Sequence, residues 1–450
     1  MDENVGNNGT KEELKGIGSD DYSVARVPLE AKSKVWRITV LRLGVLACLP
    51  LMMMGAQIGY VLPFWDGVGA VLLGSVILQA VGWALGTIAA REGLSTSLMS
   101  RWTGFGRFGS SILGLIIAIV CLFWFGIQNG VFAEGLYMLT GVLNVQIWAL
   151  ITGLIVTFIV IYGLKMMGLI ANILLPVFIV GVFIAFFLAT QQYDIIGGLT
   201  APPPAPGLMS FGAVVTMVTG GFIMGAIITP DMSRYLKNGK QVFIMVAVST
   251  FVGELVFCSI AAIMAHHVGS PDIVAVVYTI SGLLGIIVIV SATTKANTPN
   301  LYVATLGITN LIEGFSKKKF HRGTMTLIFG IIGTVLSVLG VLNLFVGFMS
   351  LLGVVLPPIA GIMVVDYFFL KRSRKELDES RERGELPEFT EKWNIIGIIS
   401  WAVAIVFAFL TPEFGIQSIN SLILSGVLYL ILMKLFDPKI KAAAALKKQG

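Results

Sequence analysis

Charged residues are scarce in this 450-residue chain. Asp, Glu, Lys and Arg together make up 12% of it, whereas ordinary soluble domains contain roughly 25%. Apolar residues make up 56%. A soluble protein cannot bury that much apolar surface in one core, but a lipid bilayer accommodates it. The composition therefore excludes a soluble globular protein and predicts a chain that crosses the bilayer several times.

Cysteine and histidine are also rare, with three of each. Cys48, Cys121 and Cys258 each lie in an apolar run, so the sequence contains neither a disulfide framework nor zinc-ligand spacing. It also lacks a Walker-type phosphate loop, a nucleophile elbow and a His–Glu metal motif. These absences argue against an enzyme, a metal site and a cofactor, and they leave a solute gradient as the energy source for transport.

Apolar runs long enough to cross a bilayer as helices occur twelve times. The first 34 residues are polar and lack the apolar core of a signal peptide, so we expect a cytoplasmic tail there. The predicted helices span residues 38–62, 69–90, 109–138, 146–164, 168–190, 208–233, 241–265, 280–311, 323–341, 344–370, 394–411 and 416–436.

The positive charges between these runs support the count. With the amino terminus in the cytoplasm, the even-numbered connections lie there too, and they contain basic residues such as Arg91, Arg234 and Lys371. The odd-numbered connections contain no Lys or Arg at all. Positive residues retained on the cytoplasmic side produce this pattern. We therefore expect a multi-pass inner-membrane protein with both termini in the cytoplasm, and the net charge of +6 implies no nucleic-acid partner.

Two of the predicted helices carry glycine and proline in mid-span. Helix 1 contains Pro50 and Gly55, and helix 6 contains Gly220 and Gly221 before Pro230. Interrupted helices in corresponding positions of two halves are typical of inverted-repeat transporters, and helices 1 and 6 correspond if helices 1–5 and 6–10 are the repeats. Backbone freed by such breaks is tolerated at membrane depth where it lines a cavity or binds a ligand.

Helices 3 and 6 carry candidate binding residues for a planar ring. Trp124 and Gln128 are four residues apart and share one face of helix 3. An indole beside a carboxamide suits a heterocycle, because the ring stacks and the amide reads its edge. In helix 6, Gly221 would let the backbone approach a ligand and Phe222 would cover the ring. The alternatives are ordinary packing, a helix–helix hydrogen bond by Gln128, and a close helix crossing at the glycines.

Helix 8 contains the most polar stretch inside any predicted span, residues 293–300. A lysine at the middle of a span is costly, so Lys295 should be paired or functional, the alternative being a side chain that reaches the interface. Asn297 and Asn300 are three residues apart and are expected to face one cavity. Glu254, near the middle of helix 7, is either a partner for Lys295 or a separate proton site.

The chain resembles the nucleobase–cation symporter-1 family of purine and cytosine permeases and hydantoin transporters, from about residue 30 to residue 435. The resemblance rests on the order and spacing of several short motifs. These are residues 91–96 (REGLST), 124–126 (WFG), 229–235 (TPDMSRY), 297–302 (NTPNLY), 357–361 (PPIAG) and 366–368 (DYF).

The resemblance implies an all-α, LeuT-type fold of twelve transmembrane helices, with two inverted five-helix repeats plus two carboxy-terminal helices. It implies alternating access and the following division of the chain. The expected units are a cytoplasmic tail (1–34), a ten-helix transport core (35–370), a cytoplasmic loop (371–393), helices 11 and 12 (394–436) and a second cytoplasmic tail (437–450).

The resemblance also implies a small heterocyclic substrate at the midplane, between helices 1, 3, 6 and 8. Trp124 would stack on the ring and Phe222 would cover it, with polar contacts from helices 3 and 8. The implied substrate-binding residues are Trp124, Gln128, Gly221, Phe222, Asn297, Asn300 and Cys48.

The coupling ion is the point at which the chain departs from sodium-coupled relatives, which hold the ion between helix 1 carbonyls and helix 8 hydroxyls. Gly44 and Ala47 still offer carbonyls, but Lys295 stands in place of a hydroxyl in an ungapped alignment. An ammonium in the sodium position predicts proton-coupled uptake, because burial makes a lysine titratable. A shifted register that used Thr293 or Thr294 would restore a hydroxyl ligand and sodium coupling.

We therefore predict a secondary transporter that imports a nucleobase or related heterocycle, with H+ favoured over Na+ as the coupling cation. One alternative is a sodium-coupled symporter of hydantoin, allantoin or a vitamin-like pyrimidine. A second is an amino-acid or amine carrier of the same fold, although residues 46–50 (LACLP) lack the glycine-rich break expected there. A third is a receptor or channel without coupled transport.

Overall fold

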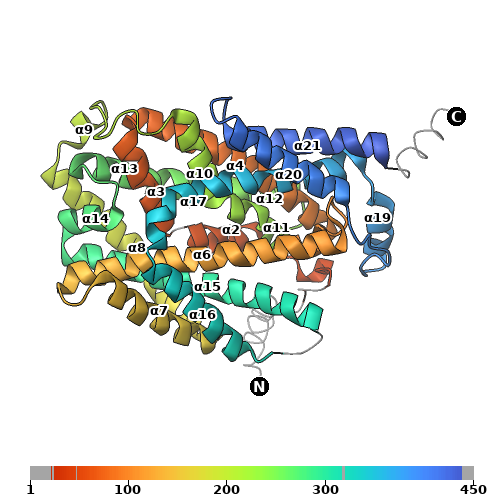
Figure 1. Cartoon of the computed structure of the whole chain (residues 1–450), viewed down its shortest axis with the longest axis horizontal. Helices are drawn as coiled ribbons and strands as arrows, with labels where there is room; N and C mark the ends of the chain where they lie inside the picture. The colour runs from red at the N-terminus through yellow and green to blue at the C-terminus, as the bar shows by residue number, and fades with distance from the viewer. Residues whose placement is uncertain (1–21, 23–24, 47, 317–319, 438–450) are drawn as a thin grey trace, which may run out of the picture.

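The structure, a computed structural model, describes residues 22, 25–46, 48–316 and 320–437. Every regular element in these ranges is a helix (Figure 1), which confirms the all-α prediction. The helices that occupy the predicted spans are α2 (Val35–Leu46), α3 (Leu49–Val61), α4 (Phe64–Glu92), α6 (Gly106–Thr140), α7 (Val145–Ile161), α8 (Leu164–Gln192), α10 (Phe211–Ile227), α11 (Thr229–Ser233), α12 (Gly239–Ala247), the π-helix η2 (Val248–Val252), α13 (Gly253–Val268), α15 (Leu283–Ser316), α16 (Arg322–Val338), α17 (Phe345–Val355), α18 (Pro357–Val364), the π-helix η4 (Val365–Leu370), α20 (Ile395–Leu410) and α21 (Gln417–Phe436).

Shorter helices lie in the connections between them. These are η1 (Leu29–Ala31), α5 (Thr96–Met99), α9 (Ile195–Gly198), α14 (Ile273–Ser281), η3 (Val341–Leu344) and α19 (Arg374–Glu382).

Helices occupy all twelve predicted ranges, but their lengths differ. Within the described residues, seven helical segments are long and apolar enough to cross a membrane, and the bent pair α2 and α3 brings this number to eight. The apolar helices α7, α16 and α20 have only 16 or 17 residues. The structure therefore supports a multi-pass membrane protein, and the count of twelve stays a prediction.

The interruption predicted in helix 1 is present. The axes of α2 and α3 differ by 57°, and α3 begins after the extended residue Cys48 with Pro50 in its first turn. Proline is tolerated there because the first amides of a helix have no partner within the helix. Ala47 lies outside the described residues. The bend therefore falls just before Pro50, and Gly55 lies within α3.

The break predicted at Gly220 and Gly221 is wrong. Helix α10 runs through both glycines and ends at Ile227, and α11 follows with Pro230 in its first turn. A side chain at Gly220 would overlap the carbonyl oxygen of Met349 on α17. The glycine therefore serves a close helix crossing, which is the role that small residues commonly have in membranes.

The helices form two groups that pack mainly within themselves. In the first group, α4 packs along α10, α11 and α12, and α13 packs along α3; in the second, α6 packs along α7, α15 and α16. Helix α8 packs on α15, and α17 packs on α10. Helices α20 and α21 pack together, and both contact α18. The polar residues of α6 and α15 thus meet within the second group, close to its boundary with the first.

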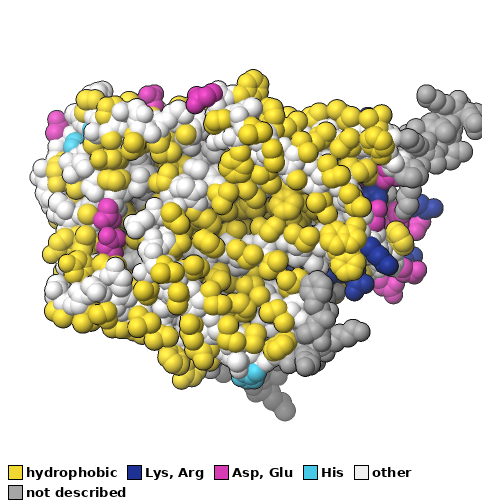
Figure 2. Space-filling view, in the orientation of Figure 1, with side chains coloured by type: hydrophobic (Ala, Val, Ile, Leu, Met, Phe, Trp, Pro, Cys, Tyr) yellow, Lys and Arg dark blue, Asp and Glu magenta, His cyan; other side chains and the backbone are white. Residues whose placement is uncertain are grey.

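In Figure 2 the Lys and Arg side chains gather at one end of the molecule together with several Asp and Glu, other acidic side chains lie toward the opposite end, and apolar side chains cover most of the face. This charged end contains α19, the last turn of α4 and residues 25–34. We call residues 25–34 the strap. Exposed apolar residues such as Phe183 and Phe187 lie along the helices between the two ends. The surface therefore has the apolar flank that lipid contact requires.

Candidate functional site

Trp124 lies in the middle of α6 and is buried. Its indole meets the rings of Phe345 and Phe348 on α17 edge to face, with centroid separations of 6.4 and 5.8 Å. Phe348 also stacks on Phe123 at 5.4 Å. Edge-to-face contacts are a favoured aromatic geometry, and together they fix the orientation of the indole. The predicted stacking residue is thus held in place by a ring cluster on the neighbouring helix.

Gln128 and Asn297 are buried on the adjacent helices α6 and α15. Among the described residues, Gln128 Oε1 and both side-chain polar atoms of Asn297 have no hydrogen-bond partner. Buried polar groups are nearly always paired, so each exception requires an explanation. A ligand that supplies donors and acceptors to these amides is one such explanation.

The neighbouring Asn129 behaves in the opposite way. Its Nδ2 donates to the carbonyl oxygen of Ala149 at 2.8 Å, and its Oδ1 accepts from Thr152 Oγ1 at 2.8 Å. Asn129 therefore makes the helix–helix hydrogen bonds between α6 and α7 that were the alternative interpretation for Gln128. The two amides differ by one position, and only Gln128 lies on the face of Trp124.

The remaining predicted substrate residues are less informative. Phe222 on α10 and Asn300 on α15 are half-buried, and Cys48 is buried at the start of α3. A side chain at Gly221 would lie 3.0 Å from Met54 Sδ, so this glycine faces another helix in the structure. The contact of these residues with a ligand stays a prediction.

Lys295 is buried on α15, and its Nζ donates to the carbonyl oxygen of Gly44 at 2.8 Å. Gly44 lies in the last turn of α2, where carbonyl groups lack partners within the helix and carry partial negative charge. The ammonium also lies 5.9 Å from the ring centre of Phe178 on α8. The side chain thus reaches the helix 1 carbonyl inside the protein, so it does not extend to a membrane interface.

The two threonines before Lys295 are used within their own helix. Thr293 Oγ1 donates to the carbonyl of Ile289, and Thr294 Oγ1 donates to that of Val290, both at 2.8 Å. Both hydroxyls are thus bonded within α15, whereas Lys295 contacts the helix 1 carbonyl of Gly44.

Glu254 belongs to a second buried polar cluster, which includes an arginine that sequence reasoning did not select. Glu254 Oε2 accepts a hydrogen bond from Ser75 Oγ on α4 at 2.5 Å. Arg42 on α2 donates to Ser249 Oγ in η2 at 3.1 Å and to the carbonyl of Gly225 at 3.2 Å. Its position near the start of the first span is typical of interfacial arginines, but Arg42 is buried. This cluster lies within the first helix group.

Comparison with known proteins gives consistent matches over nearly the whole chain. The family model of permeases for cytosine/purines, uracil, thiamine and allantoin matches residues 27–430. A cytosine permease of Escherichia coli (strain K12) is 29% identical over 425 residues, which cover 94% of this chain and 97% of the relative. A hydantoin permease of Microbacterium maritypicum is 24% identical over 396 residues, covering 82% of this chain and 79% of the relative.

Two solved structures of Mhp1, a nucleobase-cation-symport-1 family transporter, have a similar fold. The inward-facing conformation superposes with a TM-score of 0.75 at 22% identity and covers 91% of this chain and 92% of Mhp1. The closed conformation with bromovinylhydantoin bound gives 0.73 at 21% identity and covers 92% and 95%. At these identities the likeness shows the fold alone.

Proposed function

Because the chain belongs to the nucleobase–cation symporter-1 family, whose model covers residues 27–430, we propose that it imports a nucleobase or a closely related heterocycle by alternating access. The family assignment makes the protein a secondary transporter and not an enzyme. The finer proposal concerns the substrate class, the coupling ion and the orientation in the membrane.

The substrate class is supported by one observation: Gln128 Oε1 on α6 and the Asn297 amide on the adjacent helix α15 are buried and have no hydrogen-bond partner among the described residues. Their free groups comprise two oxygen acceptors and one NH2 donor. Cytosine presents an amino donor beside acceptors on one edge of a flat ring, so it complements both kinds of group. The similarity to a cytosine permease makes cytosine the first probe.

A thermal-shift screen of the purified protein tests this proposal. The ligands are cytosine, uracil, purine bases, hydantoin, allantoin and thiamine. A ligand that binds the folded protein stabilises it by mass action, by about 2.7 kcal/mol at 100 times its Kd. A rise in Tm with one of the bases supports the proposal. Amino acids and simple amines are screened in parallel, and a response only to them would instead favour an amino-acid or amine carrier of the same fold. Counterflow of radiolabelled ligand distinguishes a carrier from a receptor.

Proton coupling is supported by the position of the Lys295 ammonium on the Gly44 carbonyl. An ammonium there supplies the positive charge that a sodium ion would bring, and its proton is the candidate coupling ion. Glu254, which is buried and accepts a hydrogen bond from Ser75, is the second candidate proton site. Symport with sodium is the runner-up.

Uptake by proteoliposomes distinguishes the two ions. We expect a pH gradient to drive accumulation without sodium, and Lys295→Met to abolish accumulation while counterflow continues. Uptake that requires sodium and ignores the pH gradient would overturn proton coupling and leave the substrate proposal intact.

For the orientation, we propose that the charged end faces the cytoplasm and that the protein lies in the inner membrane. Basic residues at this end include Arg91, Arg372 and Arg381, whereas the connections at the other end contain no Lys or Arg in the sequence. The transport core would comprise residues 35–370, with α20 and α21 as the two additional helices and cytoplasmic tails at 1–34 and 437–450.

A further inference from the structure

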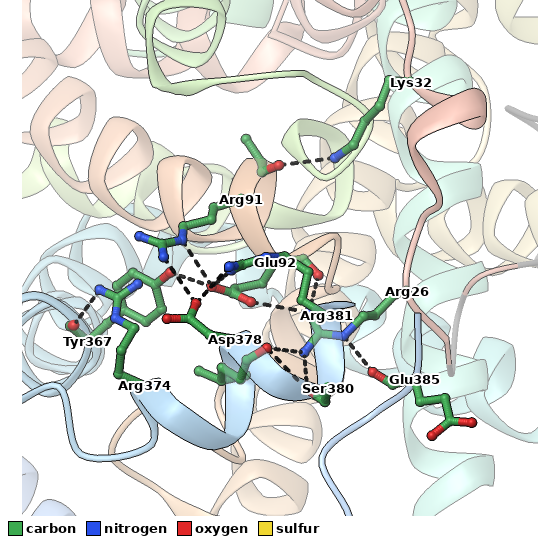
Figure 3. Close-up of polar contacts among 12 residues, drawn as sticks. Arg26, Lys32, Arg91, Glu92, Tyr367, Arg374, Asp378, Ser380, Arg381 and Glu385 are labelled. Carbon is green, nitrogen blue, oxygen red and sulfur yellow. Dashed lines mark hydrogen bonds and ion pairs between the residues drawn. The ribbon is translucent and has the colours of Figure 1, made fainter. Parts of the chain in front are cut away.

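Glu92, the last residue of α4, is a carboxylate whose side chain has no exposed surface. Tyr367 Oη donates to its Oε1 at 2.5 Å, and Arg381 Nη1 donates to the same oxygen at 3.0 Å. Arg26 Nη1 lies 3.2 Å from Oε2. We call Arg26, Glu92, Tyr367 and Arg381 the latch, and Figure 3 shows that their side chains converge on the Glu92 carboxylate.

The latch joins four segments that are far apart in the sequence. Arg26 belongs to the strap, Glu92 to α4, Tyr367 to η4 and Arg381 to α19. Arg26 also donates to Ser380 Oγ at 2.7 Å and to the carbonyl of Glu385 at 2.6 Å (Figure 3). Its guanidinium is therefore bonded to both α4 and the α19 segment.

The strap itself is attached to the first helix group. Val27 N donates to the carbonyl of Gly93 at 2.9 Å, and Ser33 N donates to that of Tyr235, beyond α11, at 2.7 Å. Lys32 Nζ donates to the carbonyls of Ala90 at 3.0 Å and Arg234 at 2.7 Å. The strap thus follows the ends of α4 and α11, which pack together in that group.

The segment after α19 is attached to the second helix group, by backbone hydrogen bonds. Arg107 N and Phe108 N, at the start of α6, donate to the carbonyls of Glu391 and Lys392 at 2.8 and 2.9 Å. Asn394 N donates back to the carbonyl of Phe105 at 3.2 Å. The 371–394 segment therefore spans the two groups, held on α6 by main-chain bonds and on α4 by the ion pairs of the latch.

A small apolar cavity lies behind this bridge, between the groups. It is lined by Ile117 on α6, Met224 and Ile227 on α10, Leu356 just before α18, Ile359 within α18, and Thr96 on α5. Helices α10 and α6 thus meet through apolar side chains between Trp124 and the charged end.

Alternating access in repeat transporters moves one helix group against another around a fixed site. Separation at the charged end must break either the main-chain bonds on α6 or the side-chain pairs of Glu92. The side-chain pairs can open without unfolding a helix end, because the guanidinium, carboxylate and phenol groups can each form hydrogen bonds with water once they are exposed. We propose that the latch holds this end of the transport pathway closed, and that its opening is the step that exposes the cavity at Ile117.

The test uses an Ile117→Cys reporter in the full-length chain, reconstituted in liposomes, with the three native cysteines replaced by alanine. The rate of its modification by a membrane-impermeant maleimide is measured with reagent on either side. Because this readout needs no substrate, it is independent of whether the substrate and coupling proposals hold.

Glu92→Gln is expected to raise the modification rate at least about tenfold, since it removes the charge that pairs with Arg26, Arg91 and Arg381. Arg26→Gln and Arg381→Gln should each give a smaller rise. Glu382→Gln is the matched control, since Glu382 is an exposed carboxylate on the same helix as Arg381, and it should leave the rate unchanged.

Covalent closure gives the converse test. Arg26→Cys with Ser380→Cys, joined by a reversible bifunctional thiosulfonate, should slow modification of the reporter thiol more than the same treatment of the Ile117→Cys protein without these two cysteines, in which the reagent can only block the reporter itself; reduction should restore the rate. The proposal is overturned if folded Glu92→Gln loses thermal stability but leaves the reporter rate unchanged, because the cluster would then be a fixed structural contact. If Glu92→Gln does not fold, the two arginine variants decide by the same criterion.

The side of the membrane from which the maleimide reaches the reporter thiol gives a separate test of the latch. A gain seen only with reagent on the face opposite the charged end would overturn the closing role of the latch. A gain on the charged side that proves to be extracellular supports the latch and overturns only the proposed orientation.

Discussion

The charged end and the adjacent helices α6 and α15 both contain buried polar groups, but these two sets are bonded differently. At the charged end, the Glu92 carboxylate has partners on both oxygens from three other segments. On α6 and α15, Gln128 Oε1 and the Asn297 amide have no partner among the described residues. Both clusters bury polar atoms, so burial alone does not distinguish them.

The difference indicates what each cluster is built to do. A carboxylate that is fully paired within the protein stabilises the arrangement of segments that pairs it. An amide without a partner is unfavourable until a ligand supplies one. The first cluster is therefore expected to hold a conformation, and the second to bind a solute, and the predictions below separate these roles.

The largest effect is expected from Glu92→Leu. Removal of one partner leaves the buried Arg26 guanidinium without its charge partner, which costs about 3–5 kcal/mol. The thermal unfolding midpoint in detergent should fall strongly, and substrate affinity at the midplane should change much less. A midpoint equal to that of the wild-type protein would mean that the pairs contribute nothing to the closed arrangement.

Trp124→Ala should show the reverse pattern. Stacking of a base on an aromatic ring is worth about 1–3 kcal/mol, so the Kd should rise up to about 100-fold. Isothermal titration with the base found in the thermal-shift screen measures this loss. Trp65→Ala, at a tryptophan that is 62% exposed, is the control and should retain affinity; full affinity of the Trp124 variant would refute the stacking role.

Asn297→Leu is expected to leave the free energy of unfolding unchanged or to raise it slightly, in contrast to the loss of stability expected for Glu92→Leu. Replacing a buried, unpaired amide by an apolar side chain of similar size is neutral or stabilising, here by up to about 1 kcal/mol, while ligand binding weakens. Asn129→Leu is the matched control, because it breaks two hydrogen bonds and should lower the unfolding midpoint. If both variants are equally destabilising, Asn297 has a partner within the protein.

Lys32 gives the smallest effect, on the pH dependence of the strap. Burial lowers the pKa of its ammonium to about 8, against 10.5 for a free lysine. The docked strap binds fewer protons than the undocked strap between these values, so docking strengthens as pH rises from about 8 to 10.5 and is weakest below 8. Hydrogen exchange of residues 25–34, corrected for intrinsic rates, should show more protection at pH 9.5 than at pH 7.5. Lys32→Met should abolish this difference.

The features that depend on residues close together in the sequence could be predicted from it. The spacing of apolar runs located the helices, and a lysine in mid-span had to have a partner, which the structure identifies as Gly44. The break in helix 6 was placed wrongly because a glycine pair has the same appearance in a break and in a close crossing. Only the position of Met349 distinguishes the two.

The latch could not be predicted, because its members have no sequence relation to one another. Glu92 meets Arg26 across 66 positions, Tyr367 across 275 and Arg381 across 289. Each of these residues alone is typical of a solvated membrane flank. Only the packing of η4 and α19 against the end of α4 removes the carboxylate from water and makes the arginines its necessary partners.

The crossing of α10 and α17 at Gly220 has a consequence for leakage. No gap separates Gly220 from the Met349 carbonyl, so the two helices cannot slide independently without a clash. Phe345 and Phe348 belong to α17, so the two rings that contact Trp124 are expected to move together with α10. A solute in contact with these rings would be enclosed or released in one concerted event, which leaves little opportunity for slippage of a half-held molecule or an uncoupled ion.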